Sequence, residues 1–148
     1  MLKKLLETYR FGFDLWGLLL FLIIMIPNFI WFAVPAPNDV MREFPDTWID
    51  TFSSVFQALM VVALCTVKNK GCGKIKLTDW IIAALICCIL YFVSWVFYYS
   101  ATVNDFVLLG LTLPPCLAFL AYEIDRKNII AVIPTAFFTI LHLLRLVI

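Results

Sequence analysis

Five separate apolar runs of about 20 residues constrain the fold of this chain more than any other feature. They cover residues 13–34, 49–67, 78–99, 103–123 and 128–147. A helix rises about 1.5 Å per residue, so each run is long enough to cross the roughly 30 Å hydrocarbon core of a bilayer. Hydrophobic residues make up 64% of the 148 and charged residues only 14%, which excludes an ordinary soluble domain. The sequence therefore predicts a single all-α domain over residues 1–148, an integral membrane bundle of five transmembrane helices.

Basic residues lie in three segments that fall on one side of a five-span chain. These are the N-terminal stretch "MLKKLLETYR", the connection "VKNKGCGKIK" and the turn "EIDRKN". The positive-inside rule predicts that this side, with the N-terminus, is cytoplasmic. The stretch predicts a short amphipathic helix along the interface, and the connection predicts a flexible loop. In the turn, Glu123 and Asp125 are expected to face solvent. Arg145, near the opposite end of the fifth span, departs from the charge pattern, and we expect its side chain to reach the interface.

The chain lacks the common signatures of enzymes and of cofactor binding. It has no nucleotide-binding glycine pattern, no C-x-x-C pair and a single histidine, so we assign no catalytic residue, no metal ligand and no cofactor. Its five cysteines are expected to be free residues within the helices. The formal net charge of +1 gives no field that would attract nucleic acid, and the expected partner is the lipid bilayer.

Prolines interrupt three of the five spans. Pro27 lies in the first, Pro114 and Pro115 in the fourth, and Pro134 in the fifth. A proline inside a helix removes a backbone donor and kinks the helix, which frees polar groups that need partners. Three proline-kinked spans of five therefore favour a cavity.

Polar side chains from four spans fall at similar depths, about 8–12 Å from the predicted outer ends. They are Asn28, Gln57, Ser94, Thr139 and His142, and the predicted outer side adds Asp39 in the loop and Asp105 at the start of the fourth span. Amides and imidazoles are costly in lipid without partners, so we expect these groups to face the bundle interior. One interpretation is a ligand-binding site open to the outside. The other is a structural layer, in which Asn28, Gln57 and His142 bond one another or freed backbone carbonyls.

Three functional hypotheses follow from this pattern. The first is a non-enzymatic protein that binds or transports a small polar or cationic solute, or a lipid headgroup, through the outer-half layer. The second is a structural or regulatory subunit of a membrane complex, with a membrane-protein partner or a second copy of the chain packed on the aromatic third span. The third is a lipid-modifying enzyme, for which His142 with Asp39 or Asp105 is the only acid–base combination that the sequence offers.

The strings "IPNFIWFAVPAPND", "LLGLTLPPCLAF" and "DRKNIIAVIPT" are spread over nearly the whole chain. Together they resemble those of small five-span membrane proteins of Gram-positive bacteria that have no assigned activity. The resemblance implies a bacterial cytoplasmic membrane as the location, and it implies no substrate, cofactor or site residue.

Overall fold

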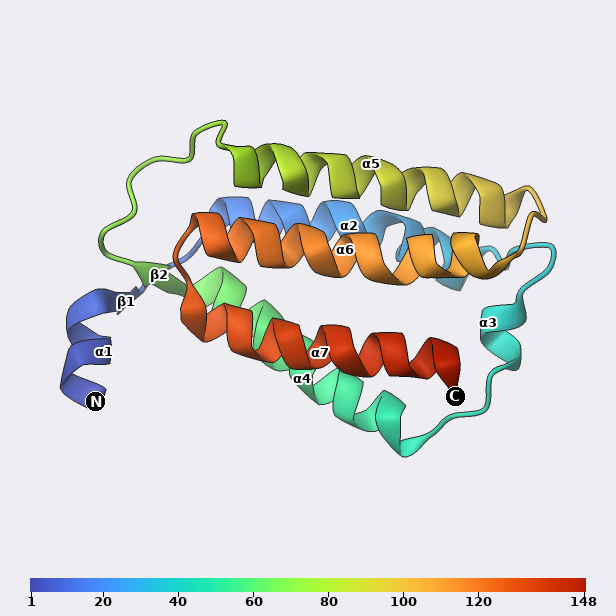
Figure 1. The fold of residues 1–148 in the computed structure, drawn as a ribbon, viewed down its shortest axis with the longest axis horizontal. Helices are drawn as coiled ribbons and strands as arrows, with labels where there is room; N and C mark the ends of the chain where they lie inside the picture. The colour runs from blue at the N-terminus through green and yellow to red at the C-terminus, as the bar shows by residue number, and fades with distance from the viewer.

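A computed structural model describes residues 1–148 as seven helices and one two-stranded sheet (Figure 1). Five long helices run along the same axis and are each long and apolar enough to cross a membrane. They are α2 (Leu15–Ala33), α4 (Trp48–Thr66), α5 (Asp79–Tyr99), α6 (Asp105–Asp125) and α7 (Ile129–Val147). The predicted all-α bundle of five spans is confirmed, and the expected boundaries agree with the helices to within two residues.

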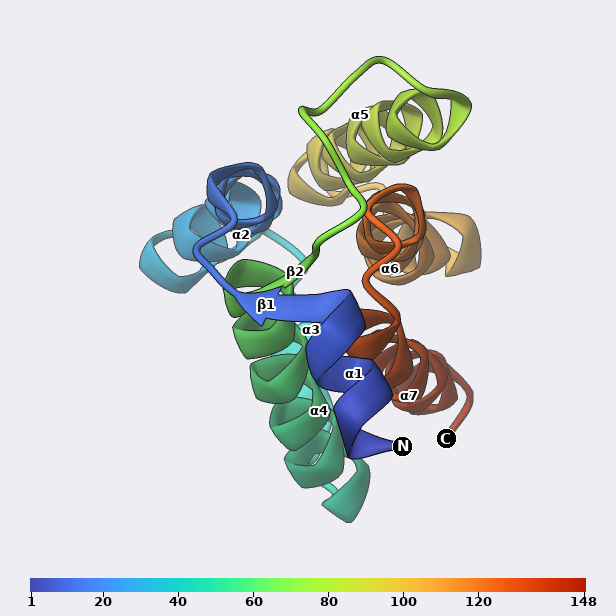
Figure 2. The same cartoon turned by 90° about the vertical axis from the view of Figure 1, so that its left-hand side faces the viewer.

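The bundle is built from two helix pairs. The helix α5 packs along α6, and α4 packs along α7, while contacts between α6 and α7 join the two pairs. The helix α2 lies at the side of both pairs and packs less extensively, as the end-on view in Figure 2 shows. The two termini lie at opposite ends of the bundle (Figure 1). We call the end that carries residues 67–78 and 126–128 the basic end, and the end that carries residues 34–47 and 100–104 the acidic end.

The remaining elements are short and lie at the two ends. At the basic end, α1 (Leu2–Thr8) leads into β1 (Tyr9–Phe11), which pairs antiparallel with β2 (Val67–Asn69). At the acidic end, α3 (Val40–Glu43) lies in the loop between α2 and α4. The predicted N-terminal helix is present but stops at Thr8. The connection after α4 is not a flexible loop throughout, because its first three residues form β2.

Each long helix begins at a polar residue that suits a helix start. Thr78, Asn104 and Asn128 accept hydrogen bonds from backbone N–H groups in the first turns of α5, α6 and α7. Asp14 does the same for α2, and Thr47 forms a capping box with Asp50 at the start of α4. These side chains satisfy donors that lipid could not, and they fix where each span starts.

The prolines lie within helices that continue past them. Pro27 is in α2, Pro114 and Pro115 are in α6, and Pro134 is in α7. Hollows of about 270 and 460 Å³ lie beside Pro27 and Pro114. The largest hollow of the molecule, about 690 Å³, lies instead at the basic end, and no proline lines it.

Close packing of α5 on α6 depends on Gly110. A Cβ atom at this position would lie 2.1 Å from Ser94 Oγ and 3.0 Å from Ser94 Cβ. The first distance is too short for a real contact and the second is tight. A larger residue at 110 therefore requires the Ser94 hydroxyl to move from its bond to Leu90, or the two helices to separate.

We therefore predict that Gly110→Ala lowers the free energy of unfolding by about 1–3 kcal/mol, the usual cost of overpacking. Ser94→Ala in the same chain should recover part of that loss, because it removes the atom nearest the new methyl group. Equilibrium unfolding of the two single variants and the double variant in detergent measures this coupling. Strictly additive effects would contradict the close contact.

Candidate functional site

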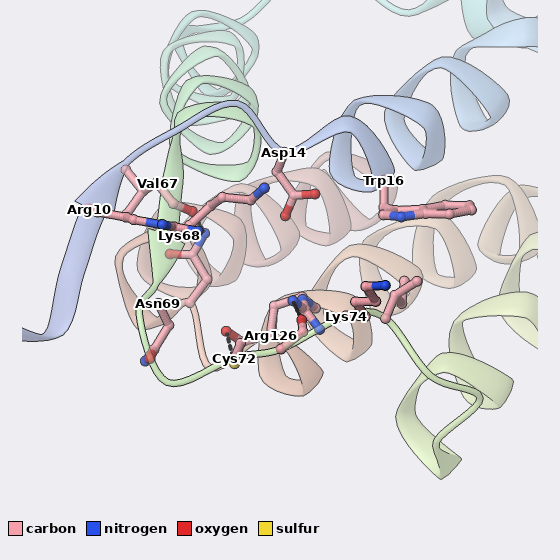
Figure 3. A pocket seen from close by; sticks show the side chains of 12 residues that line it. Arg10, Asp14, Trp16, Val67, Lys68, Asn69, Cys72, Lys74 and Arg126 are labelled. Atoms are coloured by element: carbon pink, nitrogen blue, oxygen red, sulfur yellow. Dashed lines mark hydrogen bonds between the residues drawn. The ribbon is translucent and has the colours of Figure 1, made fainter.

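The largest hollow forms a cavity of about 690 Å³ at the basic end (Figure 3). Its walls come from β1, the start of α2, β2 and the connection after it, and the turn between α6 and α7. Four cationic side chains line it, and Asp14 is the single carboxylate among the lining residues. The four cations are Arg10, Lys68, Lys74 and Arg126. We call this hollow the basic cavity.

Two of the four cations are held in place by the protein. The Lys68 ammonium donates to the carbonyl of Phe13 at 2.9 Å. The Arg126 guanidinium donates to the carbonyl of Gly73 at 2.6 Å and lies 3.9 Å from an oxygen of Asp125. The side chains of Arg10 and Lys74 have no hydrogen bond or ion pair within the protein. The cavity therefore combines two positioned cations with two whose donors are unused.

Asp14 is buried at the boundary between the cavity and the bundle core. Both of its carboxylate oxygens lie 3.0 Å from the hydroxyl of Tyr122, which donates to them, and Oδ1 also accepts from the N–H of Gly17 at 3.2 Å. The N–H of Asp14 donates to the carbonyl of Cys65 at 2.8 Å. Asp14 thus joins the start of α2 to both α4 and α6.

The turn between α6 and α7 forms another wall. Lys127 has a φ of 50°, and the N–H groups of Lys127 and Asn128 donate to the carbonyls of Ile124 and Glu123, the pattern of a Schellman motif. The carbonyl of Lys127 accepts from Tyr9 Oη and Asn69 Nδ2, each at 3.1 Å. The strand pair is therefore fastened to this turn, which brings the basic residues of β1 and β2 close to Arg126.

The structure corrects the prediction that Glu123 and Asp125 face solvent. Glu123 has no exposed surface; its Oε1 accepts from Thr135 Oγ1 at 2.7 Å, and its Oε2 has no partner. The Asp125 side chain is only 8% exposed and accepts from the hydroxyl of Thr78. The helix α6 extends to Asp125, so these two residues face neighbouring elements rather than the water beyond a turn.

The five predicted outer-half residues do not converge on one point through hydrogen bonds. Asn28 Nδ2 lies 2.7 Å from Tyr91 Oη and joins α2 to α5. Ser94 and Thr139 donate to carbonyls of their own helices, at 2.9 and 2.7 Å. Gln57 and His142 make no hydrogen bond, and the His142 ring stacks on Phe138 with centroids 4.9 Å apart. No hydrogen bond joins Asn28, Gln57 and His142 to one another. Of the three, Asn28 has a backbone partner, the carbonyl of Ile24 at 3.3 Å.

The two carboxylates predicted on the outer side, Asp39 and Asp105, share no interaction partner. Asp39 accepts from Trp31 Nε1 at 2.8 Å and from Tyr98 Oη at 3.0 Å, and it pairs with Arg42 at 3.0 Å. Asp105 is exposed in the first turn of α6. No hydrogen bond joins His142 to either carboxylate, so the acid–base combination considered for a lipid-modifying enzyme is not assembled.

Arg145 is fixed by protein groups at the acidic end. It lies 2.8 Å from Asp50 Oδ1 and donates to the carbonyl of Pro45 at 2.6 Å. The ion pair crosses from α7 to α4 and thus ties the far ends of this helix pair together. This contact explains the one basic residue that departed from the charge pattern.

Comparison of the chain with protein-family models, with curated proteins and with solved structures found no match.

In the sequence the basic residues indicate the orientation of the chain. The glycines and lysines of "KNKGCGKIK" lack the spacing of a phosphate-binding loop, so they predict a flexible loop rather than a site. The signal that could have found Asp14 is its position at the very start of the first apolar run. An acid there is typical of a helix start, and its charge needs a partner. Nothing local to the sequence brings Arg10 to Lys68, because their pairing depends on the strand register between segments 58 residues apart.

We predict that Tyr122→Phe lowers the free energy of unfolding by about 1–3 kcal/mol, because it removes the donor that both oxygens of buried Asp14 share. The matched control is Tyr9→Phe, which removes a hydroxyl at an exposed contact and should cost under about 1 kcal/mol. Equilibrium unfolding in detergent compares the two. Equal losses would show that the Asp14–Tyr122 bond contributes no more than a surface contact.

Proposed function

We propose that this chain is a membrane protein that binds the anionic headgroup of a membrane lipid in the basic cavity. The observation that carries the proposal is the gathering of four cationic side chains around one hollow of about 690 Å³ at one end of the helices. Basic pockets at the cytoplasmic ends of transmembrane helices are typical binding sites for phosphate-bearing lipid headgroups.

The chemistry of the lining supports a phosphate group as the part that is bound. Guanidinium and ammonium groups form charge-assisted hydrogen bonds to phosphate oxygens, and a guanidinium can bind two of them at once. Arg10 and Lys74 have unused donors for this purpose. Lys68 and Arg126 are held by backbone carbonyls and retain further donors, so they would bind with little loss of side-chain freedom.

The earlier hypotheses stay predictions beside this one. A solute site in the outer half would need Asn28 and Gln57, which lie on different helices and share no hydrogen bond. A role as a subunit of a complex would show itself as stoichiometric copurification of one membrane protein. The solute-site hypothesis is tested by exchanging Asn28 and Gln57 for Leu and measuring whether a ligand still raises the unfolding midpoint.

Lipid binding should depend on the cavity cations. We expect Arg10→Gln with Lys74→Gln to weaken binding of phosphatidic acid about 30-fold. Each basic residue contributes about 1 kcal/mol to the binding free energy, and about 1.4 kcal/mol corresponds to a tenfold change in affinity. Phosphatidylcholine, which carries no net charge, should bind weakly to both proteins. Native mass spectrometry of the detergent-solubilised protein counts the bound lipids.

The matched control is Lys3→Gln with Lys4→Gln, an equal charge change on α1 away from the cavity. It should leave binding within a fewfold of the starting protein. If both double variants weaken binding equally, net charge rather than the cavity attracts the lipid, and the proposal is wrong.

The orientation of the bundle can be tested separately. In a variant without its five native cysteines, we expect Asp46→Cys at the acidic end to react with a membrane-impermeant maleimide in intact cells. Lys70→Cys at the basic end should react only after the membrane is permeabilised. The reverse pattern would place the basic cavity on the outer side and contradict the positive-inside prediction.

A further inference from the structure

An apolar groove adjoins the basic cavity. It has a volume of about 330 Å³ and lies between the basic-end halves of α2 and α5, with Leu20 and Ile23 on one wall and Ile81 on the other. Lys76, in the connection before α5, is its only charged lining residue. The groove and the cavity are not separate features, because Trp16 and Ile75 line both.

The two hollows meet at the hydrogen bond already described between α2 and α6. The Tyr122 side chain lines the groove, and its hydroxyl donates to Asp14, which lines the cavity. A polar compartment at the end of the helices therefore passes directly into an apolar one. A molecule that occupied both would need one anionic end and one hydrocarbon part.

The groove runs into the membrane and opens toward it. Its α2 wall extends from Trp16 to Ile23, about 10 Å along the helix axis. Two lining side chains on opposite walls are substantially exposed, Leu19 at 43% and Leu85 at 51%. A hydrocarbon chain could thus enter from the side, between α2 and α5, without passing through water.

The net charge of the cavity indicates which kind of phosphate group fits it best. Four cations and Asp14 line the cavity, which gives a net charge of +3, and Asp125 at 3.9 Å from Arg126 lowers this to +2. A phosphodiester carries one negative charge and would leave part of this charge unmatched. A terminal phosphate carries about −1.5 to −2 at neutral pH and matches it.

We propose that the ligand is an amphiphile with a terminal phosphate, which lies in the basic cavity, and a hydrocarbon chain, which lies in the groove between α2 and α5. This inference rests on the proposed function and specifies its ligand class. The phosphate is bound by the unused donors of Arg10 and Lys74 together with those that Lys68 and Arg126 retain. The chain contacts the apolar side chains of the groove, and Trp16 packs where the two parts meet.

The experiment is a titration of the thermal unfolding midpoint in phosphatidylcholine nanodiscs with two probes. Dodecyl phosphate has both parts of the proposed ligand, and glycerol 3-phosphate has only the terminal phosphate. A ligand that binds the folded state raises the midpoint. We expect dodecyl phosphate to raise the midpoint at a concentration at least about tenfold lower than glycerol 3-phosphate does, because burial of only a few methylene groups in the groove gives a tenfold gain in affinity.

The groove variant is Leu19→Trp with Leu85→Trp, which narrows the groove at two exposed positions that should tolerate a larger ring. It should lose the advantage of dodecyl phosphate and keep the response to glycerol 3-phosphate. The control is Ile89→Trp, which places the same ring on an exposed position of α5 outside the groove and should keep both responses. Dodecyl phosphate that dissolves in the nanodisc lipid affects all variants alike, so the difference between the groove variant and this control reports only binding to the groove.

The outcomes separate the two proposals. If the groove variant keeps the full advantage of dodecyl phosphate while Arg10→Gln with Lys74→Gln loses both responses, the groove inference is overturned and the headgroup proposal stands. If neither variant changes either response, both are overturned. In a second arm, phosphatidic acid, which has a terminal phosphate, should shift the midpoint at a lower concentration than phosphatidylglycerol, which has a phosphodiester. Equal effects of the two lipids would overturn the inference that the bound phosphate is terminal.

Discussion

The buried side chain of Asn128 joins the end of α4 to the start of α7 at the basic end, and the arrangement of the cavity depends on it. Its Nδ2 donates to the carbonyls of Ala63 and Val67, at 3.2 and 2.9 Å, while its Oδ1 accepts from the N–H of Ala131 at 3.3 Å. One amide therefore completes the end of α4 and the start of α7. Carbonyl and N–H groups at helix ends need such partners, because the hydrocarbon region supplies none. With α4 fixed to the α6–α7 turn, β2 continues directly into the wall of the cavity.

The spans could be predicted from the sequence because a membrane imposes one simple rule. A run of about 20 apolar residues has almost no alternative to a transmembrane helix, and turn residues and charges mark where each run stops. The strand pair could not be predicted in the same way. Tyr9–Phe11 and Val67–Asn69 are three residues each, too short to show an alternating pattern. Only their pairing with each other across the fold defines them, and the contact of Tyr9 with Lys127 adds to it.

The polar groups were harder to place than the helices. Glu123 is followed in the sequence by other charged residues, and this charged segment predicts a solvent-exposed turn. In the structure α6 continues two residues past it, to Asp125, and the Glu123 side chain packs against Thr135, away from water. Asn28 shows the same limit. The sequence indicates that this amide needs a partner, and in the structure its partner is the hydroxyl of Tyr91, a residue that the hydropathy pattern treats only as an apolar aromatic. Depth along a helix can be counted from the sequence, whereas the direction in which a side chain points depends on the neighbouring helix.

The pairing of α4 with α7 has a consequence for the order in which the bundle is completed during synthesis. The helices α5 and α6 are adjacent in the chain and can pair as a hairpin as soon as both are inserted. The helix α4 waits for a partner that ends 81 residues later, roughly 4–16 s at ribosomal rates of about 5–20 residues per second. It is also the least apolar of the five, with a mean hydropathy of 1.6. During that interval Asp50 has no Arg145 to pair with, and Ser53, which is buried in the complete bundle, lacks its full cover. The nascent chain therefore depends on its insertion machinery to shelter α4 until the last helix arrives.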